Sequence, residues 1–293
     1  MPITNRRYNI LVDFPKVCSF LEETYNLETL NSYLPPQYFE YAQHHGLFNY
    51  TASHRIGLWE DGNTIVGISM YEMNLGMAQL HARDGYKCLL PDMLTWAEKE
   101  ISVEKDGKRT LNVFITSTED DKKQLLSGNG YEFSKKYPIT IFRYTNPFVE
   151  RELPLGFRII DGRDADMLKL KICYYRGFDH GDMPPDNDTD GVAKICYAPN
   201  ADPSLATIVV APDGDYACAL GMWMDYRNKY AYLEPLATVP KYRRLGLATV
   251  ALTRAMKKTV PLGAEYCFGG GMQFYYDLGF EIVCDWETWR KAW

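Results

Sequence analysis

The chain has 293 residues, of which 46% are hydrophobic and 24% charged, and its formal net charge is −6 at pH 7. This length is more than one hydrophobic core usually holds, so we expect two domains, each able to bury a core of its own. The acidic balance, with an isoelectric point near 5.5, argues against nucleic acid or an anionic membrane as the main partner and suits a small molecule.

Seven cysteines are scattered along the chain without any C-x-x-C motif. An odd, dispersed set is typical of free thiols in a reducing compartment, and it argues against a disulfide framework or a zinc ribbon. The N-terminal residues lack an apolar stretch of signal-peptide length, and no run approaches the roughly 20 apolar residues of a membrane span. We therefore expect a soluble, cytoplasmic protein.

Strand signals in the first half of the chain recur in the same order in the second half. Residues 60–73 predict two short strands joined by an Asp-Gly turn, and residues 128–144 place a Gly-aromatic-Glu step before a strand. The same two signals return about 150 positions later, in residues 211–226 and 277–293. We interpret this order as two copies of one α+β unit.

The join between the copies is expected near residues 145–157, where two prolines and several charges interrupt the periodicity. The predicted domains are therefore 1–150 and 151–293. In the second domain, residues 229–239 predict a strand interrupted by a proline, and residues 245–258 predict an amphipathic helix. The strand AEYCF, the short helix GMQFYYDL and the strand FEIVCDWETW, which closes the sheet, complete the domain.

The segment YRRLGLA, residues 242–248, joins a predicted strand to a predicted helix. Backbone N–H groups in the first turn of a helix have no partners, and the helix dipole is positive there. Glycine at position 246 lets a phosphate approach these groups closely, and the two arginines add charge-assisted bonds. The segment therefore predicts an anion cradle. The alternative is a loop glycine beside solvated arginines.

At these residues the chain resembles the GNAT (GCN5-related N-acetyltransferase) superfamily, whose signature is Q/R-x-x-G-x-G/A. Arg243, Gly246 and Ala248 fit it in register, and the flanks LEPLATVP and FYYDLGFEI match the family's bulged fourth strand and its final helix and strand. The resemblance covers residues 155–293, whereas the helix predicted at 89–101 lacks the signature. It implies an α+β fold of two GNAT-like domains, each a mixed, mostly antiparallel sheet flanked by helices. The first domain would be degenerate and the second would bind acetyl-CoA.

The resemblance also implies how the coenzyme would lie. The pyrophosphate would sit on the first N–H groups of the helix, and the pantetheine arm would pair with strand backbone in the gap beside Pro235. Proline cannot donate to a sheet ladder and so suits a strand that splays from its neighbour, although an edge-strand proline is the alternative. The cofactor-binding residues implied are Leu236, Ala237, Val239, Arg243, Arg244, Leu245, Gly246, Leu247, Ala248 and Thr249.

Acetyl transfer to an amine needs a base for the amine proton and an acid for the leaving thiolate. In the family the acid is a tyrosine four positions before the final Gly-Phe, which is Tyr275 here, next to Tyr276. Glu234 lies two residues before the pantetheine segment, where the family often keeps a glutamate base. The alternatives are a packing tyrosine, a salt-bridged glutamate, bound water as the base, and His180 as the base.

The second domain also carries an acidic loop. The letters DNDTDG at 186–191 match the first half of a calcium loop, but Tyr197 stands where that loop needs a bidentate glutamate, so we predict no metal site. The loop is either a solvated acidic segment or a surface that attracts a cationic amine. Its acidic residues are Asp179, Asp182, Asp186, Asp188, Asp190 and, more distantly, Asp166.

The function predicted from these residues is that of an acetyl-CoA-dependent N-acetyltransferase that acts on the primary amine of a small molecule, with a cationic amine favoured. The alternatives are a non-catalytic CoA-binding sensor or scaffold module, and a calcium-regulated binding protein. The sequence leaves open the acceptor, which can be an aminoglycoside, a polyamine, an amino acid or a peptide N-terminus. It also leaves open the oligomeric state and the role of the first domain.

Overall fold

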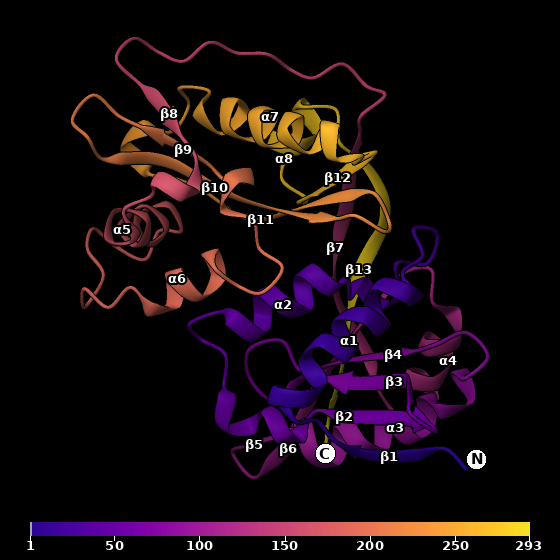
Figure 1. Ribbon diagram of the computed structural model, residues 1–293. Coiled ribbons are helices and arrows are strands. Elements are labelled where there is room, and N and C mark those ends of the chain that lie inside the picture. Colours follow the sequence, from indigo (N-terminus) through magenta and orange to yellow (C-terminus); the bar gives the residue numbers. More distant parts are fainter. Residues whose placement is uncertain (1) are drawn as a thin grey trace. The chain divides into compact units, whose positions relative to one another are not determined.

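The computed structural model describes residues 2–293 and divides into two units (Figure 1). The first unit contains the chain up to Gln43, Leu47–Ile139 and Ile282–Trp293, and the second contains His44–Gly46 and Thr140–Glu281. Each unit is a mixed sheet with helices packed against it, so the predicted α+β class is confirmed.

The first unit combines antiparallel pairing with one parallel pair. Strands β1 to β4 pair antiparallel in sequence, β4 and β6 are parallel, and β6 pairs antiparallel with both β5 and β13. In chain order its elements are β1 (Thr4–Arg7), α1 (Ile10–Thr24), α2 (Pro36–His44), β2 (Gly57–Asp61), β3 (Thr64–Met70), β4 (Met77–Ala82), α3 (Leu90–Trp96), β5 (Val103–Lys105), β6 (Lys108–Thr116), α4 (Asp120–Gly128), β7 (Glu132–Arg143) and β13 (Glu281–Ala292).

The sequence analysis expected the C-terminal strand to close the second sheet, and this expectation is wrong. Trp286–Ala292 of β13 pair with β6 of the first unit. The place in the second sheet is taken by the end of β7, where Thr140–Arg143 pair antiparallel with β12 (Tyr266–Gly269). Both β7 and β13 have 12 residues, and neither strand length nor strand period specifies which sheet a strand joins. The two units consequently differ from the predicted domains 1–150 and 151–293 in these segments.

The second unit places helices on both faces of its sheet, whose strand order is β8-β9-β10-β11-β12-β7. In Figure 1, α7 lies on one face of β9–β11, and α5 with α6 lies on the other. Besides β7 and β12, its elements are β8 (Arg158–Ile160), α5 (Met167–Gly177), α6 (Asp190–Cys196), β9 (Thr207–Val210), β10 (Tyr216–Asp225), β11 (Tyr230–Thr238), α7 (Leu247–Thr259) and α8 (Gln273–Asp277).

Helical spacing explains how α7 is held on the sheet. Leu247, Ala251, Ala255 and Met256 recur at intervals of one turn and are buried against the strands. On the opposite face, Leu170 and other residues of α5 pack against β9 and β10 in a separate apolar cluster. Helices therefore pack against both faces of the sheet.

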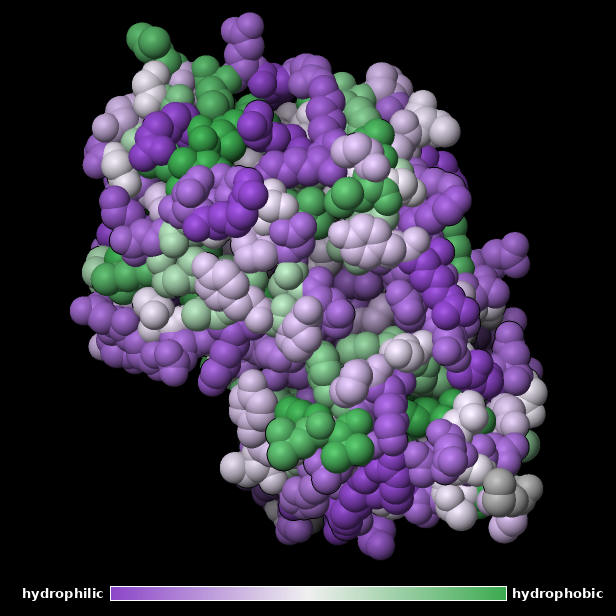
Figure 2. Space-filling model, in the orientation of Figure 1, coloured by the Kyte–Doolittle hydropathy of each residue, from purple (hydrophilic) through white to green (hydrophobic). Residues whose placement is uncertain are grey.

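The exterior is mainly polar. Hydrophilic residues dominate the face seen in Figure 2, and apolar residues form separate patches there. None of the seven cysteines is in a disulfide bond. Within residues 2–293, no helix combines the length and the apolar character that crossing a bilayer requires.

Candidate functional site

The sheet of the second unit opens between β11 and β12. These parallel strands pair at only two positions, Tyr230 with Tyr266 and Ala231 with Cys267. Beyond them β12 continues along β7 while β11 continues along β10, so the two strands diverge. In the part of the chain that the structure describes, no strand pairs with this side of β11 beyond Ala231. The divergence leaves a strand edge that an extended ligand can pair with.

A bulge in β11 lies beside this opening. Leu220 pairs with Leu236 and Met222 with Leu233, so Gly221 of β10 faces the two residues Glu234 and Pro235. A Cβ on Gly221 would lie 2.3 Å from the carbonyl oxygen of Glu234, which makes glycine necessary there. The indole N–H of Trp223 donates to the same carbonyl at 3.2 Å. Proline fits this position because the bulge interrupts the ladder.

The bulge changes which side chains share a face. Leu233 and Leu236 both pack in the apolar cluster under α7, although they are three residues apart. The regular alternation that would place Tyr232, Glu234 and Leu236 on one face is therefore broken between 233 and 236. The geometry of the bulge, and not the strand period, therefore sets the position of the Glu234 carboxylate.

The segment after β11 forms the start of a helix with exposed backbone donors. Arg244 has a φ of +67° and Gly246 a φ of +78°, and α7 begins at Leu247 without any side-chain cap. The first backbone bond of the helix runs from Val250 to Gly246, at 3.1 Å. The N–H groups of the preceding helical residues, Leu247 to Thr249, therefore precede the helical ladder and are oriented for an anion.

Arg151, which the sequence analysis did not select, lies over this helix start. Its Cδ is 3.1 Å and its Nε 3.9 Å from the position of a Cβ on Gly246. The residue belongs to the segment between the two predicted copies, where nothing in the local sequence distinguishes it from other exposed charges. Its position adds a second cation to the one supplied by Arg244, which is also exposed. Only the fold brings Arg151 to the cradle.

The two arginines of the signature have different surroundings. Arg243 donates to the carbonyls of Thr238 and Gly177, at 3.1 and 2.9 Å, and to the carboxylate of Asp179, at 2.8 Å. It therefore ties the turn before α7 to the C-terminal end of α5. Arg244 and Leu245 are exposed, whereas Leu247 and Thr249 are buried and Ala248 is half-buried. The side chain of Arg243 thus holds the turn that precedes α7 through contacts within the protein.

Some backbone groups of the segment implied to bind pantetheine already have hydrogen-bond partners within the protein. Leu236 and Ala237 pair with β10 on one side of β11. The N–H of Val239 donates to Ala217 and its carbonyl accepts from Tyr242, each at 2.9 Å. Main-chain pairing with a pantetheine arm therefore rests on β11 before Val239.

Tyr275 is buried behind the opening. Its ring contacts Phe274 and Phe280 edge-on, and a Cβ on Gly270 would lie 2.7 Å from the ring. Burial raises the pKa of the Tyr275 hydroxyl, and the negative charge of Glu234 raises it further. The structure thus brings the predicted acid and base within electrostatic range of each other, and Tyr275 is protonated at neutral pH. Tyr276, the next residue, is only half-buried.

The acidic loop is largely committed to contacts within the protein. Asp166 caps α5, Asp186 pairs with Lys171 and Asp179 pairs with Arg243. These contacts reduce the field that the loop can direct at a cation. No group of three or more potential metal ligands was found among the described side chains. His180 is exposed, and its ring lies 5.6 Å from that of Tyr175.

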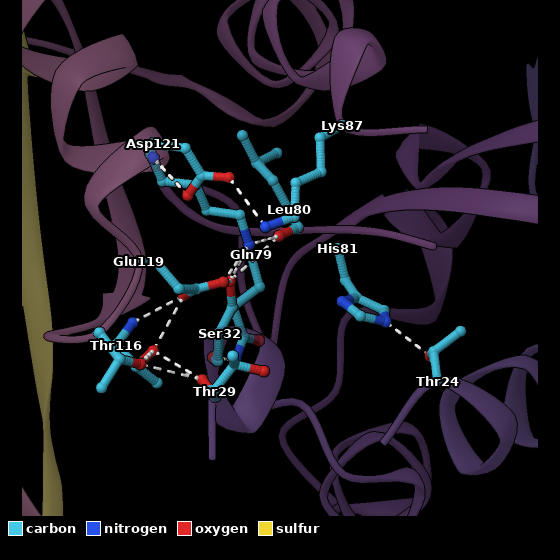
Figure 3. A network of polar contacts seen from close by, with 12 residues as sticks. Thr24, Thr29, Ser32, Gln79, Leu80, His81, Lys87, Thr116, Glu119 and Asp121 are labelled. Atoms are coloured by element: carbon cyan, nitrogen blue, oxygen red, sulfur yellow. Dashed lines mark hydrogen bonds and ion pairs between the residues drawn. The ribbon is translucent and has the colours of Figure 1, made fainter. Parts of the chain in front are cut away.

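The first unit has a corresponding parallel pair, but side chains of the protein bind the strand carbonyl beyond it. β4 and β6 pair from Met77 to Gln79, and buried polar side chains follow (Figure 3). The ammonium of Lys122 donates to the carbonyl of Leu80 and to Glu119, each at 2.6 Å, and the hydroxyl of Ser32 donates to the same carbonyl at 3.1 Å. The strand carbonyl is thus satisfied internally. Helix α3, after β4, begins at Leu90, has Pro91 in its first turn and contains no glycine.

Comparison with known proteins agrees with this geometry. Residues 167–280 match the model of the acetyltransferase (GNAT) family. A search of curated proteins found no match to the sequence.

Solved structures resemble the whole chain. One is a GCN5-related N-acetyltransferase from Sphaerobacter thermophilus, with 12% identity, a TM-score of 0.63, and coverage of 99% of this chain and 95% of that chain. Another is a tandem GNAT protein from the clavulanic acid biosynthesis pathway, with 11% identity, a TM-score of 0.65, and coverage of 99% and 98%. A third is N-myristoyltransferase of Saccharomyces cerevisiae with bound myristoyl-CoA, with 11% identity, a TM-score of 0.57, and coverage of 99% and 79%. Within the second unit, residues 167–280 therefore match the GNAT family, and the whole chain has a fold similar to that of a tandem GNAT protein.

Proposed function

We propose that the second unit binds acetyl-CoA and transfers the acetyl group to the primary amine of a small molecule. The observation that supports this most directly is the side of β11 along which no described strand pairs beyond Ala231, because β11 leads within a few residues to the N-terminus of α7, which has no side-chain cap. A strand edge suits the amide groups of a pantetheine arm, and a helix start suits a pyrophosphate. One continuous segment thus offers both kinds of partner in the order that coenzyme A needs them.

The chain's residues divide the binding of the coenzyme between backbone and charge. Leu236 and Ala237 would pair with the pantetheine arm, and the N–H groups from Leu245 to Thr249 would hold the pyrophosphate. Arg151 and Arg244 are exposed beside these groups and would neutralise its charge. Arg243 would act indirectly, by ordering the turn from which these groups project.

Two side chains would move the protons of the reaction. Acetyl-CoA supplies a thioester, and a nitrogen–carbon bond forms as the carbon–sulfur bond breaks. Glu234 would accept the proton of the attacking amine, directly or through a water molecule, so that the nitrogen reacts in its neutral form. Tyr275, kept protonated by its buried position, would give its proton to the leaving thiolate.

The alternative is that the same cradle binds CoA without turnover, as a sensor or a scaffold. Incubating the protein with acetyl-CoA and a library of primary amines separates the two functions. Release of free thiol together with an acetylated amine supports the transferase. Binding of acetyl-CoA with no thiol release from any amine supports the sensor.

The cradle predicts that Gly246→Asp raises the Kd of CoA by about 100-fold or more, because bulk and negative charge enter the phosphate position. Isothermal titration calorimetry measures this effect. Gly263→Asp is the matched control, since Gly263 also has a positive φ, of +93°, and its Cβ position is in open space. Equal CoA affinity in the two folded variants would show that the cradle is placed wrongly.

The side chains that bind the Leu80 carbonyl in the first unit predict that one chain binds one CoA. Lys122, Glu119 and Ser32 already satisfy the strand carbonyl that a pantetheine arm would meet there. The same titration on the unmodified protein gives the stoichiometry. Two equivalent sites per chain would contradict the assignment of the first unit as degenerate.

The proposed acid predicts that Tyr275→Phe lowers kcat by about 10²–10⁴-fold and leaves the KM for the amine and the Kd of CoA nearly unchanged, since proton donation matters only as the thioester breaks. Steady-state kinetics with an accepted amine tests this. Tyr276→Phe is the control, being about 100° further around the helix. If Tyr276→Phe is the inactive variant, the register carried over from the family is off by one residue.

The proposed base predicts that Glu234→Gln lowers the rate and flattens the rise of kcat/KM with pH, because the amide cannot accept the amine proton. A pH profile of the two proteins measures the change. The losses in Glu234→Gln and Tyr275→Phe should not add in the double variant, since both groups serve one step. An unchanged profile in Glu234→Gln would leave water as the base.

A further inference from the structure

A pocket lies on the face of the second sheet that carries α5 and α6, and Glu234 and Pro235 of the β11 bulge belong to its lining. The walls are mainly apolar and come from separate elements: Tyr174 of α5, Val192, Ile195 and Cys196 of α6, Ile208 of β9 and Trp223 of β10. We call this pocket the α6 slot. The proposed base therefore belongs both to the strand that borders the opening of the sheet and to the lining of a mainly apolar pocket.

The charges of the α6 slot are few and of one sign. Its described lining contains two carboxylates, Asp202 and Glu234, and no lysine, arginine or histidine. Asp202 is used locally, because its carboxylate accepts the N–H of Ser204 at 2.8 Å. Burial raises the pKa of the Cys196 thiol to about 11, so this wall is uncharged at neutral pH. The slot thus joins one acidic end to an apolar interior.

We infer that the acceptor is a hydrophobic primary monoamine, whose nitrogen lies at Glu234 and whose apolar body occupies the α6 slot. This inference rests on the proposed acetyl transfer. The cation that the sequence analysis favoured is then the ammonium group itself, drawn to Glu234, and the rest of the molecule is uncharged. Apolar contact with the slot binds the body, because it removes apolar surface of both partners from water.

The same lining disfavours the other acceptors that the sequence left open. An aminoglycoside would carry many hydroxyl groups into a slot whose walls offer few hydrogen-bond partners, and burying such groups unpaired is costly. A second ammonium of a polyamine would meet one other lining carboxylate, Asp202, which is exposed and already accepts the N–H of Ser204. An α-amino acid would bring a carboxylate close to Glu234, where no lysine, arginine or histidine among the described lining residues can pair with it. An amine with a single charge needs a partner in the slot only for its ammonium group, and Glu234 can supply it.

Two matched pairs of amines test the inference. Phenylalanine differs from phenethylamine by a carboxylate, and hexamethylenediamine differs from hexylamine by a second amine. With acetyl-CoA, we expect kcat/KM to be at least about 100-fold higher for phenethylamine than for phenylalanine, whose carboxylate must be buried without a cationic partner. We also expect a higher kcat/KM for hexylamine than for hexamethylenediamine, whose second ammonium can pair in the slot only with the exposed Asp202. Equal or better use of the doubly functional partners would overturn the inference and leave the transferase function standing. If no amine is acetylated although CoA binds, the transferase function itself is wrong, and the inference fails with it.

A variant that fills the slot gives an independent reading. Cys196→Trp should raise the KM for phenethylamine by about 10-fold or more and leave the Kd of CoA unchanged, which also shows that the domain is folded. Tyr197→Trp is the control, because Tyr197 is 60% exposed at the end of the same helix.

Unchanged kinetics in Cys196→Trp, with CoA bound normally, would overturn the inference. The inference would also be overturned if Cys196→Trp left the KM for the amine unchanged and impaired only the use of butyryl-CoA or hexanoyl-CoA. The slot would then hold the acyl chain and not the acceptor.

Discussion

The second unit depends on how closely Gly221 and Glu234 approach each other. A side chain at Gly221 would collide with the Glu234 carbonyl, which the Trp223 indole also binds. This approach accommodates the bulge that Pro235 requires, and it sets Glu234 beside the α6 slot. Beyond the bulge, β11 resumes its pairing with β10 and leads directly to the turn before α7. The carboxylate, the open strand edge and the helix start therefore follow from one local irregularity.

The two units show two outcomes of the same strand arrangement. In each, a parallel pair extends over only a few residues, and the strand backbone groups beyond it need other hydrogen-bond partners. In the first unit, the buried Lys122 and Ser32 donate to the strand carbonyl of Leu80, and Glu119 neutralises the charge of Lys122 (Figure 3). A buried ion pair adds little net stability, but loss of one partner leaves an unpaired charge. The second unit places a glycine and exposed arginines nearby instead, and its opening is suited to a ligand.

The strand exchange makes each unit depend on distant parts of the chain. The sheet of the first unit includes β13, the last strand, and the sheet of the second includes the end of β7. Neither half of the sequence contains all the strands of one unit. Pairings between residues far apart in sequence are costly in loop-closure entropy, so they require the elements between them to fold first or together. The segment between β7 and β8 joins these strands and also places Arg151 next to Gly246.

The sequence alone determined the features that depend on local chemistry. Gly246 after two arginines predicted a helix start that admits an anion, Pro235 predicted an irregular strand, and the repeat of turn signals predicted two similar α+β units. Such features are legible because glycine, proline and helix ends act on their immediate neighbours. The tertiary structure decided what depends on residues that are distant along the chain. In the folded protein, β13 pairs with the first sheet, and Arg243 donates to the end of α5. Arg151 lies next to Gly246, and Glu234 lines one pocket together with apolar side chains from α5, α6 and β9. Strand period specifies which face is buried but not which sheet a strand joins, and composition does not say which walls meet around a carboxylate.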